Sequence, residues 1–155
     1  MSIEERIVNE PDYDRFFLRH LQIVRTQNAS YVNHGRLGRG GNGTAFLVTC
    51  CSGRLAGTQM VLKVFHKISD DTRRRAFNDE VSTLKELEHP CVIRVFDEGD
   101  YFVGQERTYP FALMEYVPTT LRELLTKRRV ERLRAIRIVL NCLSALVYIH
   151  SRSKQ

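Results

Sequence analysis

The most informative stretch of the sequence is Leu37-Gly38-Arg39-Gly40-Gly41-Asn42-Gly43-Thr44-Ala45. A glycine loop of this kind either makes a simple turn or lets backbone N–H groups approach phosphate oxygens closely. A dinucleotide-binding fold would need a helix directly after the loop, but residues 45–50 are rich in β-forming residues. A P-loop would need Gly-Lys-Ser/Thr, which the sequence lacks. The loop is therefore predicted to cap a β-hairpin.

The segments on either side of this loop predict an α+β fold. Their apolar periodicity and turn residues indicate the class of each segment. We expect strands over 31–37, 45–50, 59–65, 91–96 and 109–116, turns at 97–100 and 103–106, and helices over 11–26, 70–88, 120–128 and 132–151. Ser69 or Asp70 can cap the helix that begins near residue 70.

One lysine, Lys63, interrupts an otherwise apolar strand that runs from Met60 to Phe65. Strand alternation leaves apolar neighbours on both faces. Burying an ammonium group is costly unless a carboxylate or an anionic ligand pairs with it. Lys63 therefore either has such a partner or lies near a strand end, where its side chain reaches solvent.

One glutamate, Glu80, supplies a candidate partner. It shares a face of the predicted helix with Phe77, Leu84 and Leu87, and a glutamate on an apolar stripe is unusual. The alternative is a position at the edge of the stripe, with the carboxylate in water. Because each residue accounts for the other, we expect Lys63 and Glu80 to pair.

These features together resemble the N-terminal lobe of a eukaryotic-type protein kinase. The resemblance implies a twisted antiparallel sheet of about five strands with one packed helix, followed by two helices of the C-terminal lobe. It divides the chain into an N-terminal helical extension (1–30), a kinase-like N-lobe with its hinge (31–117) and the first helices of an incomplete C-lobe (118–155).

The resemblance also implies that ATP is the ligand. In the family, the glycine loop covers the ATP phosphates, and the strand lysine holds the α- and β-phosphates and pairs with the helix glutamate. It assigns catalytic roles to Lys63 and Glu80, the gatekeeper position to Met114, and regulatory-spine positions to Leu84 and Val95. The implied nucleotide-binding residues are Leu37, Gly38, Arg39, Gly40, Gly41, Asn42, Gly43, Ala45, Val61, Lys63, Met114, Glu115 and Val117.

Several positions depart from the family pattern. Ala45 and Val61 exchange the usual valine and alanine beside the adenine ring, a swap that roughly conserves volume. Asn42 replaces the usual aromatic residue at the loop tip. The sequence contains neither His-Arg-Asp nor Asp-Phe-Gly, where the family keeps its catalytic base and metal-holding residues. We therefore expect no metal site in this chain, and Mg²⁺ only together with a complete C-lobe.

The function implied is that of the ATP-binding portion of a protein kinase, Ser/Thr-directed by family frequency, which acts on a protein substrate in a full-length parent. The chain is interpreted as truncated and inactive by itself. The alternative is a non-catalytic, pseudokinase-like module that binds a nucleotide or a partner.

Composition indicates the cellular compartment of the protein and the classes of partner it can bind. The four cysteines include no C-x-x-C pair, so we expect reduced thiols and a cytoplasmic protein. The first residues lack a secretory signal pattern, and we expect no segment to be long and apolar enough to cross a bilayer. Residues 121–155 hold nine basic and two acidic residues. We interpret them as a solvated helix face and consider nucleic-acid binding unlikely, because no aromatic residues interleave with them.

The segment 132–151 is apolar on more than one face. A helix of this kind requires burial on several sides, and the sheet can cover only part of it. We expect exposed apolar surface there and self-association through it.

Overall fold

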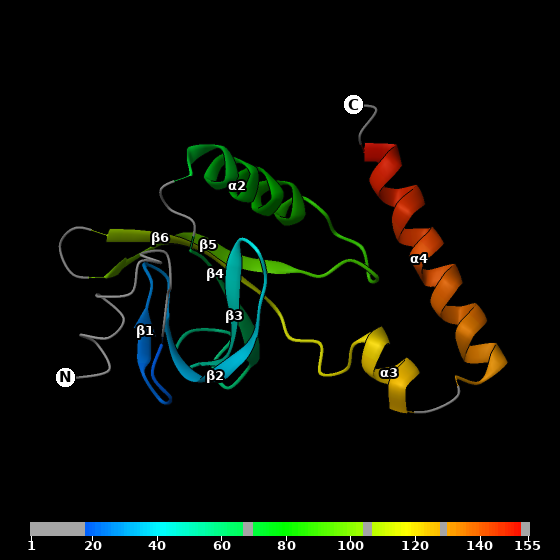
Figure 1. Ribbon diagram of the computed structural model, residues 1–155, viewed down its shortest axis with the longest axis horizontal. Helices are drawn as coiled ribbons and strands as arrows, with labels where there is room; N and C mark the ends of the chain where they lie inside the picture. The colour runs from blue at the N-terminus through cyan, green and yellow to red at the C-terminus, as the bar shows by residue number, and fades with distance from the viewer. Residues whose placement is uncertain (1–17, 67–69, 104–106, 128–129, 153–155) are drawn as a thin grey trace.

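The protein is built around one six-stranded antiparallel sheet (Figure 1). The computed structural model describes residues 18–66, 70–103, 107–127 and 130–152. The strands are β1 (Ile23–Arg25), β2 (Ser30–Arg39), β3 (Gly43–Cys50), β4 (Gln59–Phe65), β5 (Val95–Val103) and β6 (Arg107–Glu115), in the spatial order β1-β2-β3-β4-β6-β5. The helices are α2 (Asp71–Lys85), α3 (Leu121–Lys127) and α4 (Arg132–Arg152). This is the α+β lobe predicted, with one strand more than expected.

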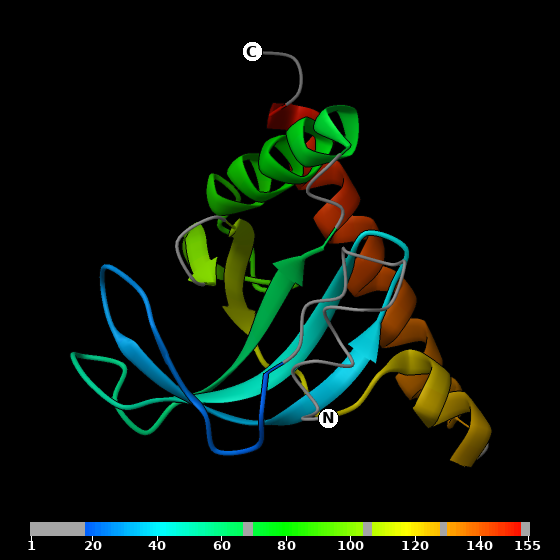
Figure 2. The same ribbon diagram turned by 60° about the vertical axis from the view of Figure 1, so that its left-hand side comes forward.

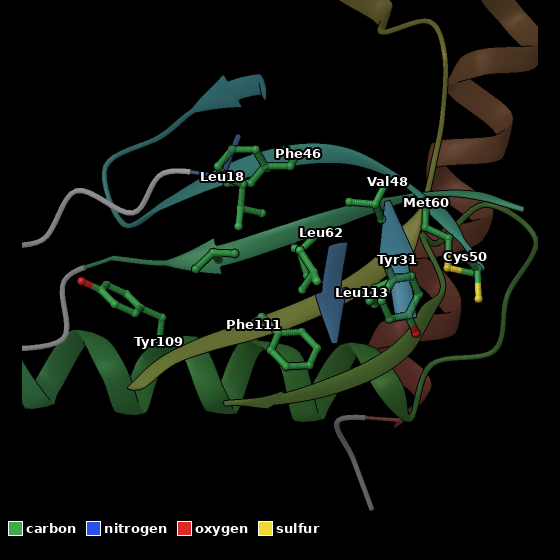
Figure 3. Close-up of a cluster of buried hydrophobic side chains, with 12 residues drawn as sticks. Leu18, Tyr31, Phe46, Val48, Cys50, Met60, Leu62, Tyr109, Phe111 and Leu113 are labelled. Atoms are coloured by element: carbon green, nitrogen blue, oxygen red, sulfur yellow. The ribbon is translucent and has the colours of Figure 1, made fainter. Parts of the chain in front are cut away.

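Strand alternation puts the main core on one face of the sheet. In β4, Met60, Leu62 and Val64 are fully buried, whereas the intervening Val61 and Lys63 are half-exposed. Figure 3 shows the buried side chains converging from several strands, and the cluster consists of Leu18, Val24, Tyr31, Phe46, Val48, Cys50, Met60, Leu62, Val64, Tyr109, Phe111 and Leu113. The opposite face of β3, β4 and β6 is left for α2 and for the candidate site.

The sheet curls until its two outer strands approach each other (Figure 2). Asp97 of β5, almost fully buried, accepts hydrogen bonds from Asn28 Nδ2 at 2.8 Å and from the Thr26 hydroxyl at 3.4 Å. Both donors lie in the turn between β1 and β2. The buried carboxylate is thus compensated by hydrogen bonds, as its burial requires. Burial, together with the negative charges of Asp97 and Cys50, raises the pKa of the neighbouring Tyr31 to about 12, against the opposing effect of a hydrogen bond with Thr26.

Helix α2 packs across β4 and β6. Its N-cap is Asp70, whose side chain accepts a hydrogen bond from the Arg73 N–H, as predicted. Phe77 and Val81 are its buried residues, and they form a second cluster with Phe65 and Ala112. The Phe65 and Phe77 rings stack with centroids 5.2 Å apart. Ion pairs from Arg74 to Asp100 (3.5 Å) and from Lys85 to Glu98 (2.9 Å) tie the exposed side of α2 to β5.

The helix predicted over 11–26 is wrong in its described part. Residues 23–25 form β1, and Leu21 has φ = 58°, which does not fit an α-helix. Val24 pairs with Tyr31 and is buried in the main core, so tertiary burial accounts for an apolar spacing that suggested a helix. Residues 11–17 lie outside the described ranges.

The strand and turn predicted over 91–100 are also misplaced. Residues 91 and 92 form a turn and a bend, residues 93 and 94 have no regular structure, and β5 runs from Val95 through Asp97-Glu98-Gly99-Asp100 to Val103. Polar turn formers fit inside this strand because Asp97, Glu98 and Asp100 each have a partner beside the sheet. Most of the turn predicted at 103–106 lies outside the described residues.

Helices α3 and α4 are found where they were predicted. α3 begins with a capping box, because the Thr120 N–H donates to Glu123 Oε2 (2.9 Å) and the Glu123 N–H donates to the Thr120 hydroxyl (3.2 Å). In α4 only Ala145 is buried, and the exposed apolar side chains are Leu133, Ile136, Val139, Leu140, Leu143, Leu146 and Val147.

By length and composition alone, α4 could cross a membrane. This corrects the expectation that no segment is long and apolar enough. The arginines of α4, apart from Arg152, are confined to its first two turns, so the remainder of the helix forms a nearly continuous apolar run.

Candidate functional site

The glycine loop caps the hairpin between β2 and β3, as predicted. The Gly40 N–H donates to the Gly43 carbonyl at 2.8 Å, which closes the turn. The Asn42 carbonyl accepts from the His66 N–H at 3.1 Å, directly after β4. The loop tip is therefore held against the end of the strand that carries Lys63.

The glycines of this loop meet different surroundings. A Cβ at Gly43 would lie 2.7 Å from the Val64 carbonyl oxygen, closer than side chains approach backbone, so this glycine is required by packing between β3 and β4. A Cβ at Gly38 or Gly41 would meet nothing within 4 Å, and one at Gly40 would meet only the Gly43 oxygen at 3.9 Å. Open space therefore borders the backbone at these three glycines.

Lys63 and Glu80 form the ion pair expected from the sequence. The Lys63 Nζ and Glu80 Oε1 atoms are 2.9 Å apart. The lysine side chain is 30% exposed and the glutamate side chain 52%. Glu80 thus lies at the edge of the apolar stripe of α2, and the lysine is the more enclosed partner. Water reaches both groups, so the pair orders the lysine more than it stabilises the fold.

Phe77 is a contact of Lys63 that sequence reasoning missed. The lysine Nζ lies over the Phe77 ring, 5.6 Å from its centroid, a distance at which the ring face attracts a cation. The sequence signal was present, since Phe77 lies three residues before Glu80 on the same helix face, but it was interpreted as packing alone. Two side chains of α2 therefore determine where the ammonium group lies.

The strand register lines up the predicted adenine-side residues beside Lys63. Lys63 lies between Ala45 of β3 and Ala112 of β6, and Val61 lies between Leu47 and Met114. Directly paired residues project from the same face of a sheet. Ala45, Val61, Lys63 and Met114 are all half-exposed on this face, which forms an apolar surface with one cation at its end beside α2.

The remaining predicted residues lie around this surface. Leu37, Arg39 and Asn42 are exposed on the hairpin, and Glu115 and Val117 are exposed where β6 leaves the sheet. The Glu115 N–H donates to the Arg94 carbonyl at 2.9 Å.

Two further predicted positions lie nearer the core. Leu84 is half-buried on α2, and Val95 packs against the Phe77 cluster.

The described residues contain no group of three or more His, Cys, Asp or Glu side chains that could hold a metal ion. The four cysteines are free thiols, and Cys50 is the buried one. The chemistry that this part of the chain offers is thus a positioned ammonium group, exposed backbone at the glycine loop and an apolar strand face.

Known proteins with similar sequences and structures are protein kinases. The family model described as protein kinase domain matches residues 31–153. The probable serine/threonine-protein kinase SCO3848 of Streptomyces coelicolor is 31% identical over 98 residues, which are 61% of this chain and 14% of the relative. The serine/threonine-protein kinase PAK mbt of Drosophila melanogaster is 26% identical over 127 residues, which are 81% of this chain and 18% of the relative.

The same fold is found in the crystal structure of the PF14_0431 kinase domain, with a TM-score of 0.70 at 16% identity, over 92% of this chain and 40% of that one. The chain therefore spans less than a fifth of the length of these two curated relatives. Because the family model covers most of its residues, the chain belongs to the protein kinase domain family.

Proposed function

We propose that residues 31–117 bind ATP, with its phosphates beneath the glycine loop and its adenine against the half-exposed face of β3, β4 and β6. The observation that carries the proposal is the Lys63–Glu80 pair, 2.9 Å apart on that face. An ammonium group fixed by a carboxylate and an aromatic ring is already oriented for an anionic ligand. The match to the protein kinase domain family supports ATP as that ligand.

The surroundings of Lys63 fit a nucleotide. Backbone N–H groups at glycines can approach phosphate oxygens where no Cβ intervenes, and Gly38, Gly40 and Gly41 border such open space. Val61 and Met114 offer apolar contact to a planar base. Glu115 leads into the exposed segment whose backbone is the candidate partner for the polar edge of adenine.

Calorimetric titration of ATP into the purified chain tests this proposal. Lys63→Met should weaken binding about ten- to a hundredfold, the loss expected for one charge-assisted contact. Lys85→Met is the matched control, because Lys85, the last residue of α2, forms an ion pair of the same length with Glu98 of β5. Equal affinities of the two variants would contradict the assignment. A folded wild type that binds no ATP would favour the partner-binding alternative.

We further propose that the 155-residue chain transfers no phosphoryl group by itself and that its full-length parent is a Ser/Thr kinase. Phosphoryl transfer depends on positioned charge and metal ions, and the sequence contains neither His-Arg-Asp nor Asp-Phe-Gly. The Ser/Thr assignment is supported by the names of both curated relatives. Incorporation of labelled phosphate into a generic protein substrate by this chain, lost in Lys63→Met, would overturn the inactivity.

A further inference from the structure

Helix α4 is fastened to the rest of the protein at the connection between α2 and β5, residues 86–94, which extends toward it in Figure 1. The Glu88 N–H donates to the Tyr148 hydroxyl at 2.9 Å. The His89 and Tyr148 rings stack with centroids 5.2 Å apart and planes 26° from parallel. His89 Nε2 lies 3.1 Å from the Ser144 hydroxyl. Three contacts thus join two neighbouring residues of the connection to two residues, one turn apart, on α4.

The second ring nitrogen of His89 settles which tautomer makes these contacts. The Cys91 N–H donates to His89 Nδ1 at 3.1 Å, so Nδ1 must carry a lone pair. In a neutral imidazole the proton is then on Nε2, which donates to the Ser144 hydroxyl. The arrangement therefore requires a neutral imidazole with its proton on Nε2, and a protonated ring would turn an N–H toward the Cys91 N–H.

We infer that protonation of His89 weakens the attachment of α4 to the α2–β5 connection. The neutral ring accepts the hydrogen bond from the Cys91 N–H and at the same time donates one to the Ser144 hydroxyl. Protonation removes the acceptor for the Cys91 N–H, opens the turn and displaces the ring from Tyr148, which loosens α4. Histidine is suited to this role because its charge changes between pH 5 and 8. The inference does not depend on ATP binding.

The charged groups around His89 carry both signs. On the connection itself, Glu88 and Arg94 line a cavity of about 300 Å³ together with His89. From β6, Glu115 lines the same cavity. From α4, Arg152 lies over the Tyr148 ring, 5.5 Å from its centroid. Two carboxylates and two guanidinium groups thus face this region, and their formal charges cancel.

NMR of the 155-residue chain tests the inference. Ring ¹⁵N shifts of His89 at pH 8 should show an unprotonated Nδ1. On acidification to pH 5, the amide shifts of Glu88, Cys91 and Tyr148 should move with the same midpoint as the imidazole. Protection of the Glu88 and Cys91 amides from hydrogen exchange, corrected for the intrinsic pH dependence, should fall about three- to tenfold, as the loss of one hydrogen bond gives.

His89→Asn provides the decisive comparison. Its Oδ1 atom replaces Nδ1 as acceptor for the Cys91 N–H and does not titrate in this range, so the protection of these amides should remain constant between pH 8 and 5. His89→Ala should show low protection at both pH values. A proton on Nδ1 at pH 8, or an unchanged pH response of Cys91 and Tyr148 in His89→Asn, would overturn the inference.

Discussion

Replacing Gly43 by alanine should destabilise the protein, whereas the same change at Gly38 should not. The added methyl group at Gly43 would lie 2.7 Å from the Val64 carbonyl oxygen and 3.4 Å from its carbonyl carbon. Both are backbone atoms of the paired strand β4 and cannot rotate away. Overpacking of this kind costs about 1 to 3 kcal/mol, which for a chain of this size lowers Tm by roughly 2 to 12 °C. Urea unfolding followed by circular dichroism measures the change.

Gly38→Ala is the matched control, because it changes the same loop but its Cβ meets nothing within 4 Å. Alanine also restricts the unfolded chain more than glycine does, so the effect should be between zero and about 1 kcal/mol of stabilisation. The m value should be unchanged in both variants. Equal unfolding free energies for Gly43→Ala and Gly38→Ala would refute the assignment of Gly43 to strand packing.

Further predictions concern the core, the pH dependence of stability and α4. Phe77→Ala should cost about 3 to 5 kcal/mol in urea unfolding, whereas Phe102→Ala, at a position 68% exposed, should change stability by less than about 0.5 kcal/mol; similar losses would contradict the packing of α2. Because burial raises the pKa of Tyr31 from 10.0 to about 12, the unfolded chain loses this proton first as pH rises. Stability should be complete below pH 10 and then decrease by at most about 3 kcal/mol as the pH rises through 12, and a Tyr31→Phe variant with the same decrease would exclude Tyr31 as its source. The exposed apolar side chains of α4 should cause self-association, and sedimentation of the Val139→Glu, Leu143→Glu double variant should show less of it; a monomeric wild type would contradict this.

The candidate site was the most predictable part of the molecule. Lys63 interrupts an apolar strand and Glu80 shares a helix face with apolar residues, and this sequence pattern was enough to predict their ion pair, although Glu80 lies at the exposed edge of that face. The hairpin followed from glycines placed between two strand-like segments. What the sequence could not show is that Gly43 serves strand packing while Gly38 and Gly41 border open space, because that distinction depends on Val64, a residue 21 positions away.

The predictions that failed concern segments whose structure depends on residues distant in the sequence. Val24 fits a helical spacing with Leu21, and only its pairing with Tyr31 makes it part of a strand. The run Asp97-Glu98-Gly99-Asp100 has the composition of a turn. It continues β5 because Asn28, Lys85 and Arg74 supply partners for its carboxylates.

The role of His89 was missed because its contacts come from α4, more than 50 residues along the chain. The sequence presented this residue only as the neighbour of a proline, and nothing local distinguished it.

The hydrogen bonds to Asp97 have a consequence for solubility. An outer strand of an open sheet presents unpaired backbone groups that can recruit strands from other molecules. Here the curl brings the β1–β2 turn over β5, and the Gln22 side chain also reaches the Tyr101 hydroxyl at 3.5 Å. The two edge strands, β1 and β5, thus cover each other's free edges. Because β1 is only three residues long, it also offers few backbone groups for pairing. Edge-to-edge pairing is therefore disfavoured at these two borders, and Asp97 accepts two of these three hydrogen bonds across them.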